Sequence, residues 1–367
     1  MRYLFPLSPY NQQRQFQKPV WVYPCHLAAY ATYLRNEGED VYWGKTEANY
    51  LTERIMSNCR DSYGEVNPYL SQTMAPISTH DLKIIENDFK IDMPFEQLPF
   101  PDRTFTDAKN KRWQSYGNYK LHPATHMMAS NLCWWGKCTF CVDTAKLEAG
   151  EKRGLRSVDH VLEEIDDLIR LGFREVFDDS GTFPIGDWLT EFCNKMIKSG
   201  RNKRIVVGCN MKPISEKVVP FKLMKEAGFR FILVGVESAN QRTIDHIKKG
   251  QESSKVIENM KAMNDAGLEV HLTSMFGYPW ETHEENMNTV NEIHYLLRKG
   301  YVKTAQASVF MPPRTAPAPN AEAQKYIQKV YDIYKDPRYW FRKLIDIKRI
   351  EDITYLLKRI GHVKHAE

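Results

Sequence analysis

The chain has 367 residues, of which 42% are hydrophobic and 26% are charged, and its formal net charge at pH 7 is +5. This composition excludes a wholly disordered or fibrous protein, and no apolar run approaches the ~18 residues that a membrane span needs. The small excess of basic residues forms no continuous run, so neither a membrane nor a nucleic acid is an expected partner. The first residues lack the apolar core of a secretory signal, which predicts a cytoplasmic protein.

Residues 1–100 form the first of three predicted regions, a short α/β extension. Val20–Tyr23 and Asp40–Trp43 are expected strands, and His26–Asn36 is the expected helix between them. This order of elements predicts one βα unit. The two prolines within Leu98–Asp102 block regular pairing, so this segment is an expected irregular connector.

The second predicted region, residues 101–320, alternates short apolar runs with segments of helical period. This alternation predicts right-handed crossovers and a parallel sheet. Six strands are too few for an eight-stranded closed barrel, so the expected fold is α/β with an open, partial (βα)6 barrel. The expected strands are Thr125–Leu132, Arg174–Phe177, Arg204–Gly208, Arg230–Val236, Glu269–Phe276 and Thr304–Phe310, and the expected helices are Val158–Leu171, Asp187–Ser199, Ser215–Ala227, Ser254–Ala266 and His283–Arg298.

Glycines follow these helices, where a left-handed residue ends a helix without strain, and Ser157 and Asp187 stand where helix N-caps belong. The third region, residues 321–367, is an expected C-terminal helical cap. Its predicted helices are Ala321–Tyr334, Tyr339–Ile347 and Glu351–Ile360.

Three of the seven cysteines, Cys133, Cys138 and Cys141, follow the first barrel strand with C-x4-C-x2-C spacing. Three soft thiolates close together indicate a metal. A [4Fe–4S] cluster can use three cysteines and leave one iron open, whereas structural zinc needs a fourth ligand, such as Cys209 or a histidine. The preceding strand, the flanking aromatic residues and the βα repeat that follows favour the cluster.

Polar residues and glycine also stand at the ends of the other expected strands. Because the carboxyl ends of parallel strands meet at one edge, these residues would surround a ligand bound to the open iron. They include Asp178, Asp179, Ser180, Cys209, Asn210, Glu237, Ser238, Phe276 and Gly277. Cys209 is expected to point toward this mouth as a small wall residue.

These motifs together make the chain resemble the radical S-adenosylmethionine (SAM) superfamily, over about residues 95–320. Within it, the chain looks like the subgroup that often carries a cobalamin-binding domain before the barrel. The matching segments are Leu98–Arg103, Cys133–Cys141, Phe177–Asp179, Leu223–Gly228, Gly235–Ser238, Lys248–Gly250 and Gly277–Thr282.

The resemblance implies that Cys133, Cys138 and Cys141 hold a [4Fe–4S] cluster whose open iron binds SAM. Reductive cleavage of SAM would give methionine and a 5′-deoxyadenosyl radical that takes a hydrogen atom from the substrate. The implied SAM contacts are Asp178, Asp179 and Ser180 for the amino group, Glu237 and Ser238 for the ribose or methionine part, Phe140, Phe276 and Gly277 for the adenine, and Asn210 beside them.

The chain departs from the subgroup in several places, two of which bear directly on cofactor binding. Only one βα unit of a doubly wound cobalamin domain is recognisable, and no Asp-x-His-x-x-Gly motif is present, so cobalamin-dependent methyl transfer is one expected reaction beside cobalamin-free modification. Met211-Lys212 stands where the family often has an arginine, which leaves the SAM carboxylate without an assigned residue.

The expected partners are a small-molecule or peptide substrate and an external electron donor of the flavodoxin or ferredoxin type. The alternative hypothesis is a non-catalytic iron–sulfur or zinc module for electron transfer or structure. Iron bound without SAM turnover would favour that alternative.

Overall fold

The computed structural model describes residues 2–5, 25–43, 82–84, 93–110, 114, 119–311, 321–347 and 349–355. These residues belong to two compact units, Met1–Trp113 and Gln114–Glu367. The predicted strand Val20–Tyr23 lies outside the described residues.

The first unit contains a parallel three-stranded sheet in the order β2-β1-β3. Its strands are β1 (Arg2–Phe5), β2 (Asp40–Trp43) and β3 (Leu82–Ile84), and α1 (Cys25–Asn36) connects the first two. The predicted helix and the strand after it are confirmed, whereas β1 and β3 are too short and too isolated in sequence to be recognised by periodicity. Leu27, Ala31 and Leu34 on one face of α1 pack with Val41, Trp43 and Phe105.

The irregular connector after residue 97 is confirmed, and it packs on α1. Its short 3-10 helix η2 (Phe95–Gln97) is followed by turns. The Asp102 backbone N–H donates to Thr32 Oγ1 at 2.8 Å, and Arg35 Nη1 lies 3.0 Å from Asp102 Oδ2. These polar contacts replace the strand pairing that the prolines prevent.

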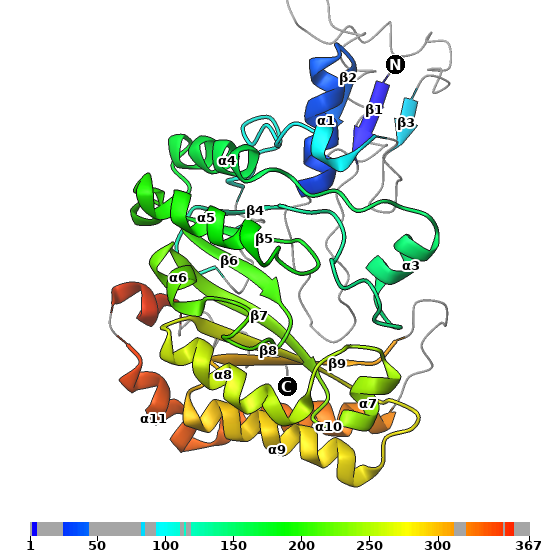
Figure 1. Ribbon diagram of the computed structural model, residues 1–367, viewed down its shortest axis with the longest axis vertical. Helices are drawn as coiled ribbons and strands as arrows, with labels where there is room; N and C mark the ends of the chain where they lie inside the picture. The colour runs from blue at the N-terminus through cyan, green and yellow to red at the C-terminus, as the bar shows by residue number, and fades with distance from the viewer. Residues whose placement is uncertain are drawn as a thin grey trace, which may run out of the picture. The chain divides into compact units, whose positions relative to one another are not determined.

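The second unit is built on a parallel six-stranded sheet in the order β4-β5-β6-β7-β8-β9 (Figure 1). The predicted α/β class and open, partial barrel are therefore correct. The first strand is shorter than predicted because the chain leaves the sheet after Met127 to form the cysteine-containing loop. The strands are β4 (Ala124–Met127), β5 (Glu175–Asp178), β6 (Val206–Met211), β7 (Phe229–Glu237), β8 (Glu269–Phe276) and β9 (Thr304–Val309).

Helices connect successive strands, as the right-handed crossover rule requires. The α-helices are α3 (Val142–Glu148), α4 (Val158–Arg170), α5 (Asp187–Lys198), α6 (Phe221–Glu226), α7 (Gln241–His246), α8 (Val256–Asp265), α9 (His283–Lys299), α10 (Ala321–Tyr331) and α11 (Pro337–Ile345), and the 3-10 helices are η4 (Arg201–Lys203), η5 (Ser253–Lys255) and η6 (Asp332–Lys335). None of the helices described is long and apolar enough to cross a membrane.

Local chemistry explains where these helices begin and end. The Ser157 side chain accepts the His160 N–H and caps α4 as predicted, whereas Asp187 is the first residue of α5 and not its cap. Helix α6 starts only at Phe221 because Pro220 disfavours a helical conformation in the residue before it. The five predicted glycine stops all have positive φ: Gly172, Gly200, Gly228, Gly267 and Gly300.

Apolar packing aligns the strands of the second unit. Tyr119, Ala124, Phe177 and Phe231 form one buried cluster on the sheet. The α5 residue Phe192 packs edge to face on Phe229 of β7, with ring centroids 5.9 Å apart. The parallel strands therefore end along one edge, where their following loops come together.

Candidate functional site

The cysteine loop, residues 128–141, is held at Cys133 from two directions. The Cys133 N–H donates to Asp143 Oδ2 at 2.8 Å, and Arg153 Nε donates to the Cys133 carbonyl at 3.0 Å. A Cβ on Gly181 would lie 2.1 Å from Asp143 Oδ2 and 3.2 Å from the Cys133 nitrogen. Only glycine at this position lets the loop lie against the end of β5.

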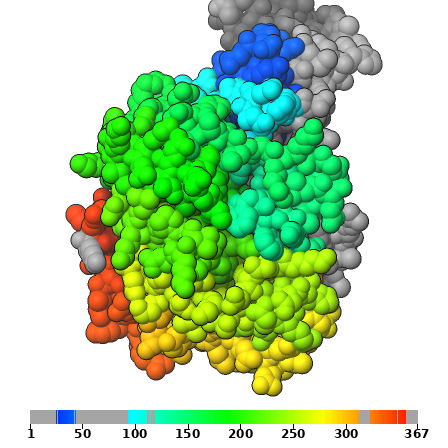
Figure 2. All heavy atoms as spheres, in the orientation of Figure 1, coloured from blue at the N-terminus to red at the C-terminus, as the bar shows by residue number. Residues whose placement is uncertain are grey.

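The far side of the cysteine loop docks on residues 247–250, directly after α7. The Thr139 N–H donates to the Ile247 carbonyl at 3.0 Å, and Trp135 Nε1 donates to the Lys248 carbonyl at 2.9 Å. A Cβ on Gly250 would lie 2.0 Å from the Trp135 ring. Figure 2 shows the blue-green region that contains the loop and α3 beside the yellow-green region that contains α7 and the segment after it. The loop is therefore held between the end of β5 on one side and the segment after α7 on the other.

The three thiols share one environment, and none of them is in a disulfide. Cys138 is buried, Cys133 and Cys141 are half-buried, and Cys133 Sγ donates to Thr182 Oγ1 at 3.2 Å. Burial raises the pKa of Cys138 to about 11, and the neighbouring Cys141 and Cys133 add to this, while Lys249 and Lys212 oppose it. Binding a metal requires thiolates, which nearby ammonium groups stabilise.

The donor set fits an iron–sulfur cluster. Among the described residues, no three His, Cys, Asp or Glu side chains converge where a single ion could bind. Each cysteine of a [4Fe–4S] cluster binds its own iron, so the thiols surround the cluster and need not meet at one point. Three unoxidised thiols on one clamped loop, with buried ammonium groups beside them, provide the ligands and the charge that such a cluster needs.

Glu237 ends β7 in a strained conformation. Its φ is +66°, and the register between β7 and β8 shifts between Gly235 and Glu237. The carboxylate is buried, with Oε1 2.6 Å from Lys249 Nζ. Although burial disfavours the ammonium, Glu237 and Cys138 raise the pKa of Lys249. The predicted SAM contact at Glu237 is thus engaged by a buried lysine that faces the cysteine loop.

Lys212 follows β6 and is the second buried cation at this edge, only 7% exposed. Its Nζ lies 3.4 Å from the centre of the Trp135 ring and donates to the Gly250 carbonyl at 3.3 Å. Burial and Lys249 lower the pKa of Lys212 to about 8, and the charge of Cys138 opposes this shift.

Three of the predicted SAM-binding side chains hold the strand ends together. Asp178 accepts the backbone N–H groups of Ala129 at 2.7 Å and Ser180 at 3.0 Å. Ser180 Oγ accepts the Ser130 N–H at 2.9 Å, and Asn210 Nδ2 donates to the Ser180 carbonyl at 3.0 Å. Burial raises the pKa of Asp178 to about 6. These side chains shape the ends of β5 and β6. Whether they also contact SAM is not tested by these bonds and stays a prediction.

Asp179 differs from its two neighbours because its side chain is exposed at the same edge. Desolvation of the carboxylate by the protein around it, and then the negative charge of Asp178, raise the pKa of Asp179 to about 7, while a hydrogen bond with Asn210 opposes this shift. A carboxylate in this position can meet a ligand's cationic or amino group. Of the acidic pair predicted at this strand end, Asp179 is the one whose side chain is accessible to a ligand.

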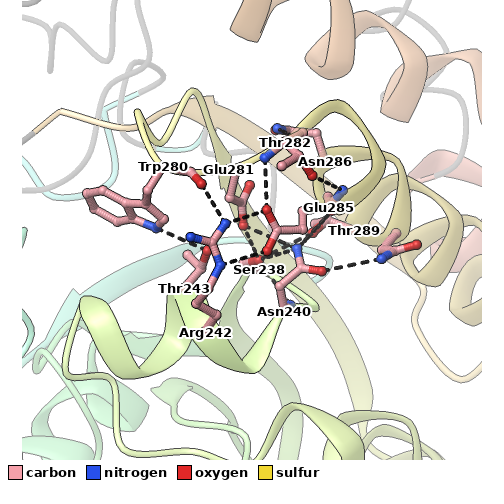
Figure 3. Close-up of polar contacts among 11 residues, drawn as sticks. Ser238, Asn240, Arg242, Thr243, Trp280, Glu281, Thr282, Glu285, Asn286 and Thr289 are labelled. Carbon is pink, nitrogen blue, oxygen red and sulfur yellow. Dashed lines mark hydrogen bonds and ion pairs between the residues drawn. The ribbon is translucent and has the colours of Figure 1, made fainter.

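Ser238 belongs to a polar network that joins the loops after β7 and β8 (Figure 3). Ser238 Oγ donates to Glu281 Oε1 at 2.6 Å and accepts from Asn240 Nδ2 at 3.0 Å. Asn240 also donates to the Glu285 carbonyl at 2.8 Å, and Thr282 caps α9 in a capping box with Glu285. Ser238 is fully buried in this network, so its side chain positions the loops.

The residues predicted to line the adenine differ in how deeply they are buried. Phe140 is half-buried against Ile244, Ile247 and Tyr278. Phe276 is fully buried and its ring stacks on Tyr326 of α10, with centroids 6.1 Å apart. Gly277 follows it with a φ of +90°. At the end of β8, the backbone at Gly277 is therefore better placed than the Phe276 ring to line an adenine.

Cys209 does not reach the mouth, contrary to expectation. Its side chain is fully buried, and its thiol interacts electrostatically with Cys193 of α5 and with Asp178. It pairs in register with Asp178, so the two side chains lie on the same face of the sheet. Cys209 therefore belongs to the packing between the sheet and α5.

Sequence reasoning assigned no role to Lys212, Lys249, Asp143 or Gly181. The Lys248–Gly250 segment matches the family pattern and Lys212 stands at a strand end, so the sequence positions of both lysines indicate that they lie near the site. Nothing in the sequence showed that either ammonium group would be buried against the cysteine loop, because that contact joins segments ~75–115 residues apart.

Comparison with known proteins gives a consistent result. The model of the radical SAM superfamily matches residues 127–293. The chain is 29% identical over 155 residues to an uncharacterized methyltransferase of Pyrococcus horikoshii (PH0819), covering 42% of this chain. It is 24% identical over 196 residues to a putative methylthiotransferase of Methanocaldococcus jannaschii (MJ0865), covering 51% of this chain. The matches span 33% and 41% of those two relatives.

A solved structure similar to this chain is that of the cobalamin-dependent SAM radical enzyme OxsB with aqua-cobalamin bound. The match covers 93% of this chain and 56% of OxsB, with a TM-score of 0.56 and 13% sequence identity. At this identity the likeness shows the fold alone.

Proposed function

Because residues 127–293 are a domain of the radical SAM superfamily, we propose that this protein binds a [4Fe–4S] cluster and cleaves SAM reductively. Cys133, Cys138 and Cys141 would hold the cluster. The observation that carries the proposal is the placement of these thiols on one clamped loop at the carboxyl edge of the sheet. The exposed Asp179 follows β5 at the same edge.

The bound cluster, once reduced, would supply one electron to SAM, whose C–S bond breaks to give methionine and the 5′-deoxyadenosyl radical. Asp179 would accept hydrogen bonds from the SAM amino group. Phe140 and the backbone at Gly277 would line the adenine. The half-buried Trp134 and Trp135 would limit access of water to the sulfurs.

The test is anaerobic reconstitution with iron and sulfide, followed by dithionite and SAM. We expect about four irons per chain by the chemistry of the cluster and release of 5′-deoxyadenosine measured by chromatography. Replacing Cys133, Cys138 and Cys141 together by alanine should abolish both. Cys193→Ala is the matched control, because Cys193 lies in α5 outside the loop and should leave both intact.

Two outcomes would contradict the proposal. Iron and nucleoside formation that survive the triple alanine substitution would show that other residues hold the cluster. A folded protein that contains zinc, or that holds iron without cleaving SAM, would favour the structural or electron-transfer module.

Methyl transfer with cobalamin is a second, finer candidate. It is favoured by the parallel β1-α1-β2 unit before the barrel, by the methyltransferase name of the Pyrococcus relative and by the 93% coverage in the match to OxsB. The substrate would be a small molecule or a peptide, and a flavodoxin- or ferredoxin-type protein would deliver the electron. Titration with hydroxocobalamin, followed by absorbance, and transfer of labelled methyl from SAM test this candidate; no binding and no label in product would exclude it.

A further inference from the structure

We propose that Lys212 is the charge-compensating residue of the cluster, and that its ammonium group favours the reduced state. This inference rests on the proposed function, since it assumes that the cysteine loop holds the cluster. It assigns a role to a residue that approaches the loop from β6, a strand that contributes no cysteine ligand.

Lys212 is a buried cation with no carboxylate partner in the part of the chain that the structure describes. Its side chain touches the Trp135 ring and the Gly250 carbonyl, and among the described residues no Asp or Glu oxygen lies within ion-pair distance of its Nζ. Lys249, 8% exposed at the same edge, has the Glu237 carboxylate at 2.6 Å. Burying an ammonium group is costly unless an anion is nearby, so Lys212 calls for an anion that the protein's carboxylates do not supply.

The charged groups that face Lys212 include both cations and the thiols of the cysteine loop. Lys249 and Lys137 repel its ammonium, whereas Cys138 and Cys133 attract it when they are thiolates. A [4Fe–4S] cluster with three thiolate ligands carries net negative charge, and reduction adds one more negative charge. The anion that Lys212 lacks is therefore the one that the cysteine loop would hold.

The position of the Lys212 ammonium group is constrained by its aromatic neighbours. Trp135, which stands between Cys133 and Cys138 in the sequence, holds the ammonium by a cation–π contact, and the centre of the Trp134 ring lies 5.6 Å from the Lys212 Nζ. The same Trp135 is fixed by its hydrogen bond to the Lys248 carbonyl. A charge held in place in a water-poor setting acts on the cluster more strongly than a mobile surface charge.

The test is a potentiometric titration of the reconstituted cluster without SAM, followed by electron paramagnetic resonance of the reduced state. Lys212→Met removes the charge and keeps the length of the side chain. We expect it to lower the equilibrium constant for one-electron reduction by about tenfold, which is about 59 mV. Lys212→Arg keeps the charge and should stay close to the parent protein.

Lys137→Met is the matched control. Lys137 also lies over the Trp135 ring, at 4.9 Å, but its side chain is exposed. Solvent and salt screen its charge, so its removal should shift the potential far less than removal of Lys212. Equal shifts for the two lysines would overturn the inference, because they would report net charge and not the buried position.

The remaining outcomes separate this inference from the proposed function. If the parent protein holds no cluster, the proposed function fails. If the parent and Lys212→Met both hold the cluster at the same potential, the inference fails alone, even where SAM affinity falls. If Lys212→Met cannot retain the cluster, recovery of iron content in Lys212→Arg supports the inference, and loss in both variants overturns it.

Discussion

Buried cations lie at both the amino edge and the carboxyl edge of the six-stranded sheet, but the two edges give them different partners. At the amino edge, Arg230 of β7 lies between Glu175 and Glu269, with Nη1 2.8 Å from Glu269 Oε2 and its other nitrogens bound to Glu175 Oε1. Lys120 pairs with Glu269 at 2.8 Å and also with Asp352. At the carboxyl edge, Lys249 pairs with Glu237, whereas within the described part of the chain Lys212 contacts aromatic rings and a carbonyl and no carboxylate.

This difference distinguishes cations that stabilise the fold by pairing with carboxylates of the chain from a cation whose counter-anion would come from a bound group. Burial disfavours the charge on Arg230, but Glu175 and Glu269 outweigh it and raise its pKa. Its charge is satisfied within the chain. An unmatched buried cation lowers the stability of the empty protein, and such a cost is expected where a site is prepared for an anion.

The largest effect on stability is expected from removing a paired cation at the amino edge. Arg230→Met leaves the buried Glu175 without its cationic partner, and we expect a loss of about 3–5 kcal/mol of unfolding free energy. Lys212→Met leaves no carboxylate unpaired, so it should leave the stability of the cluster-free protein unchanged or higher. Chemical denaturation of both variants, measured without iron, checks the contrast; comparable losses would erase the distinction between the two edges.

A smaller effect is expected from crowding the cysteine loop. Gly181→Ala places a Cβ where Asp143 Oδ2 and the Cys133 backbone now lie. Overpacking of this kind costs about 1–3 kcal/mol, which here should appear as weaker retention of iron and sulfide. The melting of the far-ultraviolet signal should change less than the cluster content. Full cluster loading in this variant would show that the close approach of Gly181 is not needed.

The exposed carboxylate of Asp179 predicts a change of about tenfold in the affinity for SAM with pH. The pKa of Asp179 is raised to about 7, so the carboxylate is largely protonated at pH 6 and ionised at pH 8. Affinity for SAM should therefore rise with pH across this window, by roughly tenfold per pH unit at most for one proton. Equilibrium binding at pH 6, 7 and 8 measures it. Asp179→Asn should remove this component, and an unchanged pH profile in that variant would assign it to another group.

The smallest effect is expected from removing the N-cap of α4, which lies away from both edges of the sheet. Ser157 Oγ accepts the His160 N–H at 3.2 Å and caps α4. Ser157→Ala should lower the unfolding free energy by about 1 kcal/mol without changing iron content or SAM cleavage. Ser157→Asp, which preserves the cap, should recover the stability. A change in cluster chemistry in either variant would show that global stability, and not the local site, controls the other results.

Much of this protein could be predicted from residue order alone. Alternating periodicity located the six strands and most of the helices of the second unit, and the glycine stops and the Ser157 cap follow from local backbone chemistry. The cysteine spacing and the residues at the strand ends indicated the superfamily, and the match over residues 127–293 bears this out. These signals lie within a few residues of one another along the chain.

Tertiary structure alone decided how the residues at the carboxyl edge are used. It turned Cys209 toward α5, enclosed Ser238 in a hydrogen-bonded network and left Asp179 exposed. It also buried two lysines against one loop, Lys212 after β6 and Lys249 after α7, and among the described residues only Lys249 has a carboxylate as its partner. Periodicity reports which face of an element is apolar, but burial and ion pairing depend on which distant segments meet, and only the folded chain specifies that.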